Sequence, residues 1–258
     1  MKTATVTAHF GEWLQGRLGP KGPVVLTTLP CQALQVSAPG DAPPPFAPDV
    51  LARFAARLGL ASVPSGVTRN FPLGIGAGAS TAALIALARA AGYDDSPERL
   101  AQACIRAERA SDPLMFPCPD RLLWASRQGR VLREMRPPPR AAILGGQWGP
   151  PVYTDAGDET FEDVTDLVQD WQETVEQGDL TRLSAVASES ARRCTARRGP
   201  PDPMAELSRD LGALGIVRAH TGSVRGLIFA PGTIPSHGAE ALREAGLTGV
   251  LTFETGAT

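Results

Sequence analysis

The stretch from Phe71 to Thr81 constrains the fold of this chain most, because it places a glycine-rich turn directly before an apolar helix. It reads FPLGIGAGAST, with glycines at alternate positions, and the apolar run 82–91 follows at once. Glycines at this spacing let successive backbone N–H groups converge on an anion, and hydroxyls at a helix start add further donors where the dipole favours negative charge. The pattern predicts a loop that binds a nucleotide triphosphate, with contacts from Pro72, Gly74, Gly76, Ala77, Gly78, Ala79, Ser80 and Thr81.

Two other interpretations of this loop remain open. The spacing from Gly74 to Ala79 also satisfies the G-x-G-x-x-A form of a dinucleotide fingerprint, and Asp94 and Asp95 follow at about the 20-residue interval expected for a ribose-binding acid. Pro72 argues against that form because it interrupts the strand that would enter the first glycine, and the DSPE sequence from Asp95 onward is typical of a helix start. A glycine loop without any ligand is the third interpretation.

Charge and composition limit the classes of partner. The 258 residues carry a formal net charge of −2, so no overall field favours nucleic acid or an anionic membrane surface. Lys2 and Lys21 are the only lysines, so a phosphate clamp would use arginine or backbone amides. The 4 cysteines form no C-x-x-C pair, and no signal-peptide pattern or bilayer-length apolar run is present. We therefore expect a cytoplasmic protein that acts on small molecules, without a nucleic-acid or membrane partner.

The chain alternates strand-like and helix-like segments in two halves. Short strands separated by Gly and Pro are expected at 3–8, 24–29, 33–38, 67–71, 141–144, 216–219, 226–229 and 250–253, and residues 122–132 are expected to be extended with a turn at Gln128-Gly129. Apolar residues at helical spacing predict helices at 49–60, 80–91, 97–109, 164–176, 180–195, 204–214 and 236–245. The proline-rich stretch 41–48 is expected to be a loop. This mixture predicts an α+β fold, with a domain boundary at the prolines of 136–140 that separates residues 1–136 from residues 137–258.

Two further segments accompany the glycine loop. Residues 11–16 read GEWLQG, and residues 219–229 read AHTGSVRGLIF, where a second glycine turn lies between apolar strand-like residues. In this order the three segments resemble the three motifs of the GHMP kinase superfamily, the small-molecule kinases that act on galactose, homoserine, mevalonate and related substrates. GEWLQG is most similar to the G-E-L-x-Q-G form of the L-threonine kinases of cobalamin biosynthesis. Residues 110–116, ASDPLMF, resemble the P-[ST]-D segment of the same group.

The resemblance covers almost the whole chain and implies a fold, a reaction and cofactors. The implied fold has an N-terminal half like ribosomal protein S5, with the ATP-binding glycine loop, and a ferredoxin-like C-terminal half. The implied reaction uses ATP and Mg²⁺ to phosphorylate the hydroxyl of free L-threonine, and O-phospho-L-threonine then supplies the aminopropanol linker of cobalamin. A GHMP kinase for another small alcohol such as homoserine, and a nucleotide-binding sensor without turnover, are the alternatives.

Phosphoryl transfer requires mainly positioning and charge neutralisation, so we expect one acid to hold Mg²⁺ and another to orient or deprotonate the acceptor hydroxyl. Glu108 and Asp112 are the candidates, because they lie four residues apart at a helix end and share a face if the helical turn persists. The resemblance implies that Asp112 is the catalytic carboxylate and that Ser80 and Glu108 are metal ligands. The family usually has Glu-Pro before the hydroxyl residue, whereas Arg109-Ala110 stands here and displaces Glu108 by one position. Asp120 is the alternative acid, and a simple helix cap is the structural alternative for both candidates.

The first and third segments supply the candidates for substrate binding. Glu12 and Gln15 are candidates for recognising the amino and carboxylate groups of an amino acid or for steadying the phosphate loop, with a surface turn as the alternative. Thr221, Gly222 and Ser223 are candidates for substrate contacts, with Gly222 and Ser223 approaching the phosphates or the acceptor, and an ordinary hairpin turn is the alternative.

Overall fold

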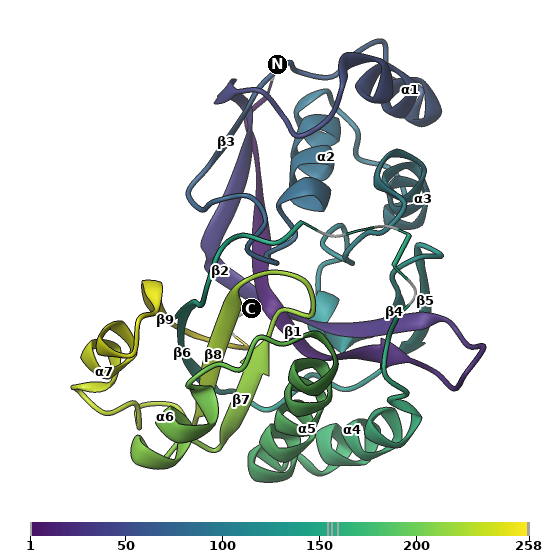
Figure 1. The fold of residues 1–258 in the computed structure, drawn as a ribbon. Helices are drawn as coiled ribbons and strands as arrows, with labels where there is room; N and C mark the ends of the chain where they lie inside the picture. Colours follow the sequence, from purple (N-terminus) through teal and green to yellow (C-terminus); the bar gives the residue numbers. More distant parts are fainter. Residues whose placement is uncertain (1, 154, 156, 159, 257–258) are drawn as a thin grey trace.

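Two long strands form the centre of the sheet in the computed structural model of the protein, which describes residues 2–153, 155, 157–158 and 160–256. β1 (Ala4–Arg17) pairs antiparallel with β2 (Val24–Ala42) through most of its length. Their register shifts between Thr7 and Ala8, between His9 and Glu12, and between Glu12 and Leu14. Such bulges bend a strand, and Figure 1 shows both strands turning sharply before their connecting hairpin.

The remaining strands extend this pair into a nine-stranded sheet. They are β3 (Val67–Arg69), β4 (Leu122–Ala125), β5 (Arg130–Glu134), β6 (Ala142–Gln147), β7 (Gly215–Arg218), β8 (Val224–Phe229) and β9 (Thr248–Glu254). The order is β5-β4-β2-β1-β7-β8-β6-β9, and β3 pairs with β2 beside this path. The pairs between these strands are antiparallel, and β1 meets β7 at the pairing of Glu12 with Arg218. The first and third motif segments therefore lie on neighbouring strands.

Seven α-helices cover the sheet within the described residues. They are α1 (Pro48–Leu58), α2 (Ala79–Ala90), α3 (Pro97–Glu108), α4 (Thr165–Gln177), α5 (Leu180–Arg198), α6 (Met204–Asp210) and α7 (Gly238–Glu244), and a short 3₁₀ helix η1 spans Pro119–Arg121. α2 packs on β1 and β2 and is buried on nearly all sides, as an alanine-rich helix without a polar face requires. Figure 1 shows α1 to α3 grouped beside the start of β1 and the end of β2, which lie side by side in the antiparallel pair, with α4 and α5 at the other end.

Several expected elements differ from the structure. The separate strands expected at 24–29 and 33–38 are one continuous strand, β2, and the strand expected at 3–8 continues to Arg17. The Gly and Pro residues in these segments suggested turns, but the chain stays extended there because β1 and β2 supply hydrogen-bond partners for each other's backbone groups. The helix expected at 204–214 ends at Asp210, because the chain must turn there to enter β7. The expected loop 41–48 is shorter, since β2 reaches Ala42 and Pro48 begins α1, where a missing N–H costs nothing.

The hydrophobic core crosses the predicted boundary at 136. One cluster joins Phe10, Trp13 and Trp124 to Trp171 and Val217, and a smaller cluster lies under α6 and α7. Trp13 and Trp171 are fully buried with ring centroids 5.8 Å apart, so the two sides of the boundary share packing. The division into residues 1–136 and 137–258 stays a prediction. None of the helices among the described residues is long and apolar enough to cross a membrane.

Candidate functional site

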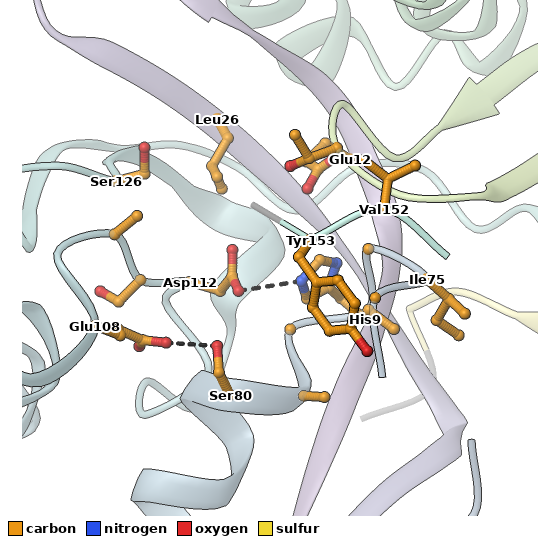
Figure 2. A pocket seen from close by; sticks show the side chains of 18 of the residues that line it. His9, Glu12, Leu26, Ile75, Ser80, Glu108, Asp112, Ser126, Val152 and Tyr153 are labelled. Carbon is orange, nitrogen blue, oxygen red and sulfur yellow. Dashed lines mark hydrogen bonds and ion pairs between the residues drawn. The ribbon is translucent and has the colours of Figure 1, made fainter. Parts of the chain in front are cut away.

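The three motif segments meet at one cavity of about 270 Å³. β1 supplies one wall, the glycine loop and the start of α2 supply a second, and the segment after α3 supplies a third (Figure 2). The walls include the following predicted residues: Glu12, Gln15, Pro72, Gly74, Gly76, Ala77, Gly78, Ala79, Ser80, Glu108, Asp112 and Thr221. Residues that were predicted from segments more than 200 positions apart in the sequence are therefore neighbours.

The glycine loop approaches the other walls so closely that only glycine fits at its end. Gly78 is the N-cap of α2 in the left-handed conformation, with φ +68°. A Cβ at this position would lie 2.5 Å from His9 Cδ2 and 2.9 Å from Asp112 Oδ2. The loop is fixed by backbone bonds to β1 and β8, from His9 N to the Ala77 carbonyl and from Val224 N to the Ile75 carbonyl. The start of α2 thus lies at the cavity, and because the first N–H groups of a helix have no acceptor within the helix, this arrangement is suited to an anion.

The two hydroxyls at the start of α2 both contact Glu108. The Ser80 hydroxyl donates to Glu108 Oε2 at 2.5 Å, and the Thr81 hydroxyl donates to Glu108 Oε1 at 2.7 Å. Burial raises the pKa of Glu108 to about 8, although these two hydrogen bonds oppose the shift and the charge of Asp112 adds to it. Thr81 itself is 1% exposed and does not line the cavity, so its hydroxyl positions Glu108 from the buried side of that carboxylate.

The oxygens of Ser80 and Glu108 are suited to bind a hard divalent cation. A carboxylate with a pKa near 8 takes up a proton at neutral pH unless a positive charge replaces that proton, and no cation pairs with Glu108 among the described residues. Ser80 and Glu108 offer hydroxyl and carboxylate oxygens, the ligand types that Mg²⁺ prefers, at the end of the glycine loop.

Asp112 lies beside Glu108 for a different reason than the sequence suggested. α3 ends at Glu108, and Arg109 takes a left-handed conformation with φ +66°, so Glu108 and Asp112 do not share a helix face. The interpretation based on helical spacing was wrong in this respect. Thr81 brings the two acids together instead, because the Asp112 N–H donates to its hydroxyl oxygen at 3.2 Å while that hydroxyl donates to Glu108.

His9 is the positive partner of Asp112. Its Nδ1 lies 3.0 Å from the Gly11 carbonyl, which can only accept, so Nδ1 carries a hydrogen, and Nε2 lies 3.3 Å from Asp112 Oδ2. The geometry at Nε2 is that of an ion pair rather than of an aligned hydrogen bond. Burial lowers the pKa of His9, but the charge of Asp112 and contact with it outweigh burial and raise the pKa to about 9. The site therefore holds an imidazolium against the Asp112 carboxylate at neutral pH.

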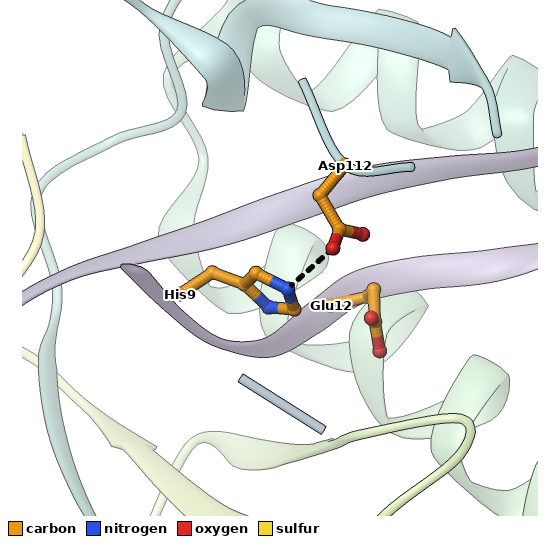
Figure 3. A group of neighbouring side chains, drawn as sticks. All are labelled: His9, Glu12 and Asp112. Atoms are coloured by element: carbon orange, nitrogen blue, oxygen red, sulfur yellow. Dashed lines mark ion pairs between the residues drawn. The ribbon is translucent and has the colours of Figure 1, made fainter. Parts of the chain in front are cut away.

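Glu12 joins this pair because of a bulge. Residues 9 and 12 of a regular strand point to opposite faces, but the register shift between them, with Gly11 at φ +72°, turns Glu12 to the side of His9 (Figure 3). One ligand atom from each of His9, Glu12 and Asp112 lies within 4.8 Å of the others. Burial raises the pKa of Glu12 to about 7, with His9 opposing the shift, and Glu12 accepts the His220 N–H at 3.0 Å.

The third segment divides between the cavity and its support. Thr221 lines the cavity, whereas Gly222 and Ser223 are not among its walls. Gly222 lies against the backbone of Ile75 and Gly76, and the Ser223 carbonyl accepts the Trp148 N–H at 2.8 Å. This segment holds the glycine loop in place through backbone contacts.

The cavity also has walls that the sequence analysis did not predict, among them four ring-bearing or basic side chains. His9 lies on β1 two positions before the first motif, and Arg127 follows β4; Tyr153 and Phe161 come from the connection between β6 and α4. An ionisable residue within an apolar strand was the available signal for His9, and no local pattern marked the others. The alternative acid Asp120 lies on η1 and lines a different cavity.

Solved structures of small-molecule kinases share the fold of this chain. The mevalonate kinase from methicillin-resistant Staphylococcus aureus MRSA252 gives a TM-score of 0.60 at 15% identity, covering 98% of this chain and 99% of its own. The homoserine kinase from Cytophaga hutchinsonii ATCC 33406 gives 0.61 at 14% identity, covering 98% and 95%. The Streptococcus pneumoniae phosphomevalonate kinase gives 0.63 at 10% identity, covering 98% of each chain. No family model and no curated protein sequence matches. The likeness confirms the α+β fold of the GHMP kinases that the sequence predicted.

Proposed function

We propose that this protein is an ATP- and Mg²⁺-dependent kinase that phosphorylates the hydroxyl of free L-threonine, for the aminopropanol linker of cobalamin. The observation that carries the proposal is the cavity in which a glycine loop, a hydroxyl–carboxylate pair and an aspartate with a buried positive partner converge. Phosphoryl transfer needs these three elements: a phosphate cradle, a metal ligand set and a group that orients the acceptor.

Each part of the proposed site has one role. The backbone N–H groups of the loop from Gly74 to Ala79 bind the phosphates of ATP at the start of α2. Ser80 and Glu108 would hold Mg²⁺, which would supply positive charge to neutralise the phosphoryl group. Asp112 accepts or orients the proton of the acceptor hydroxyl.

The geometry of Asp112 supports this role. Its Oδ2 faces His9 and Thr81, while its Oδ1 has no hydrogen-bond partner among the described residues, and the side chain is 20% exposed to the cavity. Oδ1 is thus the oxygen that receives the acceptor hydroxyl. His9 fixes the orientation of the carboxylate and balances its charge, which makes it a positioning residue.

The choice of L-threonine is supported by the GEWLQG segment. Glu12 and Gln15 of this segment line the cavity on the β1 side, away from the glycine loop, where an amino acid would lie with its hydroxyl toward Asp112. Homoserine is the competing acceptor, because a homoserine kinase is among the proteins that share the fold.

The test is a turnover assay with purified protein, ATP and Mg²⁺. L-threonine, L-homoserine, L-serine and mevalonate are compared by ADP release, and the phosphorylated product is identified by mass spectrometry. We expect the highest kcat/KM with L-threonine and formation of O-phospho-L-threonine. More efficient use of homoserine would overturn the acceptor assignment. ATP binding without turnover of any alcohol would favour the sensor interpretation.

A further inference from the structure

Arg127 is the only arginine or lysine among the described residues that line the cavity. The other ionisable walls are Glu12, Glu108, Asp112, Tyr153 and His9, and His9 already faces Asp112. Arg127 therefore provides the one positive charge of the described cavity walls that is not paired with a carboxylate. A guanidinium at a substrate cavity is suited to a planar anion, because its N–H groups match the two oxygens of a carboxylate.

Among the described residues no carboxylate forms a close ion pair with the Arg127 guanidinium, although the charges of Asp158 and Asp155 act on it from farther away. Its Nη2 donates only to the backbone carbonyls of Asp155 and Asp158, at 3.3 Å each. The carboxylate of Asp158 pairs with Arg198 at 2.7 Å, and that of Asp155 accepts the Gly157 N–H at 2.7 Å. The Nη1 of Arg127 is buried and has no hydrogen-bond partner among the described residues. An unpaired buried N–H group of this kind is costly unless a ligand supplies the acceptor.

The fold places Arg127 at the acceptor end of the cavity. Ser126, the residue before it, accepts the Ser111 N–H at 3.0 Å and so ties the end of β4 to the residue next to Asp112. In Figure 2, Ser126 and Leu26 lie on the far side of Asp112 from Ser80. The guanidinium also lies 5.9 Å from the ring centroid of Phe161, another cavity wall.

Besides His9 Nε2, two further polar side-chain atoms at the cavity have no hydrogen-bond partner among the described residues. The Oε1 of Gln15 is buried without a hydrogen bond, and so is the Oγ of Ser111, whose residue is 2% exposed. Both residues line the cavity. The oxygen of Gln15 can only accept, so it suits an ammonium group, whereas Arg127 can only donate.

We infer that Arg127 binds the α-carboxylate of the acceptor, that Gln15 accepts a hydrogen bond from its α-ammonium group, and that the acceptor is therefore a zwitterionic hydroxy-amino acid. This inference rests on the proposed function for the hydroxyl transfer, but not for the binding of the two charged groups. It distinguishes the acceptor from sugars, which carry no carboxylate, and from hydroxy acids, which carry no ammonium group.

The experiment compares substrates that differ by one charged group. Wild-type protein and Arg127→Gln are assayed with L-threonine and with L-threoninamide, in which a neutral amide replaces the carboxylate. Because the carboxylate would accept a charge-assisted hydrogen bond from Arg127, we expect wild type to prefer L-threonine over L-threoninamide by about 10- to 150-fold in kcat/KM. In Arg127→Gln this preference should fall to near unity, mainly through KM, because the carboxylate has lost its partner. Arg127→Lys keeps the charge and should keep part of the preference.

Arg130→Gln is the matched control. Arg130 lies on the same β4–β5 hairpin, is exposed, and bonds Gln128 at 2.7 Å outside the cavity, so its loss should leave the preference unchanged. Equal use of the two substrates by wild type, or an equal loss for both in Arg127→Gln, would overturn the inference.

Calorimetric binding of L-threonine without ATP separates the two proposals. Binding by wild type that weakens at least 10-fold in Arg127→Gln supports the inference even if no alcohol is phosphorylated, in which case the kinase proposal fails alone. Phosphorylation of uncharged alcohols with no binding of L-threonine would refute the inference and leave a kinase. Thermal unfolding of the variants checks that they fold.

Discussion

Gly78→Ala tests the closest contact of the site. The new methyl group would lie 2.5 Å from the buried ring of His9 and 2.9 Å from Asp112 Oδ2, at a backbone φ of +68°. The left-handed conformation costs a residue with a Cβ about 1–2 kcal/mol, and an added methyl in a packed site costs about 1–3 kcal/mol more. We expect the free energy of unfolding to fall by the sum, about 2–5 kcal/mol, and the His9–Asp112 pair to move away from the glycine loop.

Gly178→Ala separates the two contributions. Gly178 follows α4 with φ +69°, nearly the value of Gly78, but nothing lies within 4 Å of its Cβ position. This control carries only the conformational cost of about 1–2 kcal/mol. Urea unfolding followed by tryptophan fluorescence should place Gly78→Ala about 1–3 kcal/mol below Gly178→Ala, and calorimetry with an ATP analogue and Mg²⁺ should show weaker binding for Gly78→Ala alone. Equal destabilisation and unchanged nucleotide affinity would refute the reasoning.

Three further perturbations address the acids, the metal ligand and the ion pair. Asp112→Asn should fold, bind ATP and lose about 10²-fold or more in kcat, whereas Asp120→Asn, outside the cavity, should stay near wild type. If steady-state kinetics gave the reverse result, the catalytic role would have been assigned to the wrong acid. Ser80→Ala should raise the Mg²⁺ concentration needed for half-maximal turnover, and an unchanged Mg²⁺ titration would remove Ser80 from the ligand set. The pKa of His9 rises from 6.5 to about 9 on folding, so the protonated imidazole stabilises the fold below pH 6.5 and this contribution disappears as pH rises through 9. Unfolding experiments should find the stability difference between wild type and His9→Gln smaller by about 3 kcal/mol at high pH, and a constant difference would contradict the charged pair.

The local features of the site could be predicted because neighbouring residues encode them. The start of α2 could be predicted from Gly78, because glycine adopts the left-handed N-cap conformation without strain, and from the alanine-rich run that follows it. The helix start at Ser96-Pro97 was likewise visible, since the Ser96 side chain caps Arg99 N. The resemblance to known motifs added the expectation that Asp112 lies near the loop, and the structure places its Oδ2 within 2.9 Å of the Cβ position of Gly78.

Pairings between distant segments depended on the tertiary structure. Glu12 joins His9 and Asp112 because β1 bulges at Gly11, and Asp112 leaves the helix face of Glu108 because α3 ends there. Neither event has a signature in the spacing of polar and apolar residues. The joining of two expected strands into β2 likewise depends on β1 supplying hydrogen-bond partners across the sheet. The sequence alone therefore determined which backbone segment can cradle an anion, since φ preferences and caps act over a few residues. The tertiary structure decided which charges face that cradle, because burial and pairing depend on residues far apart in the chain.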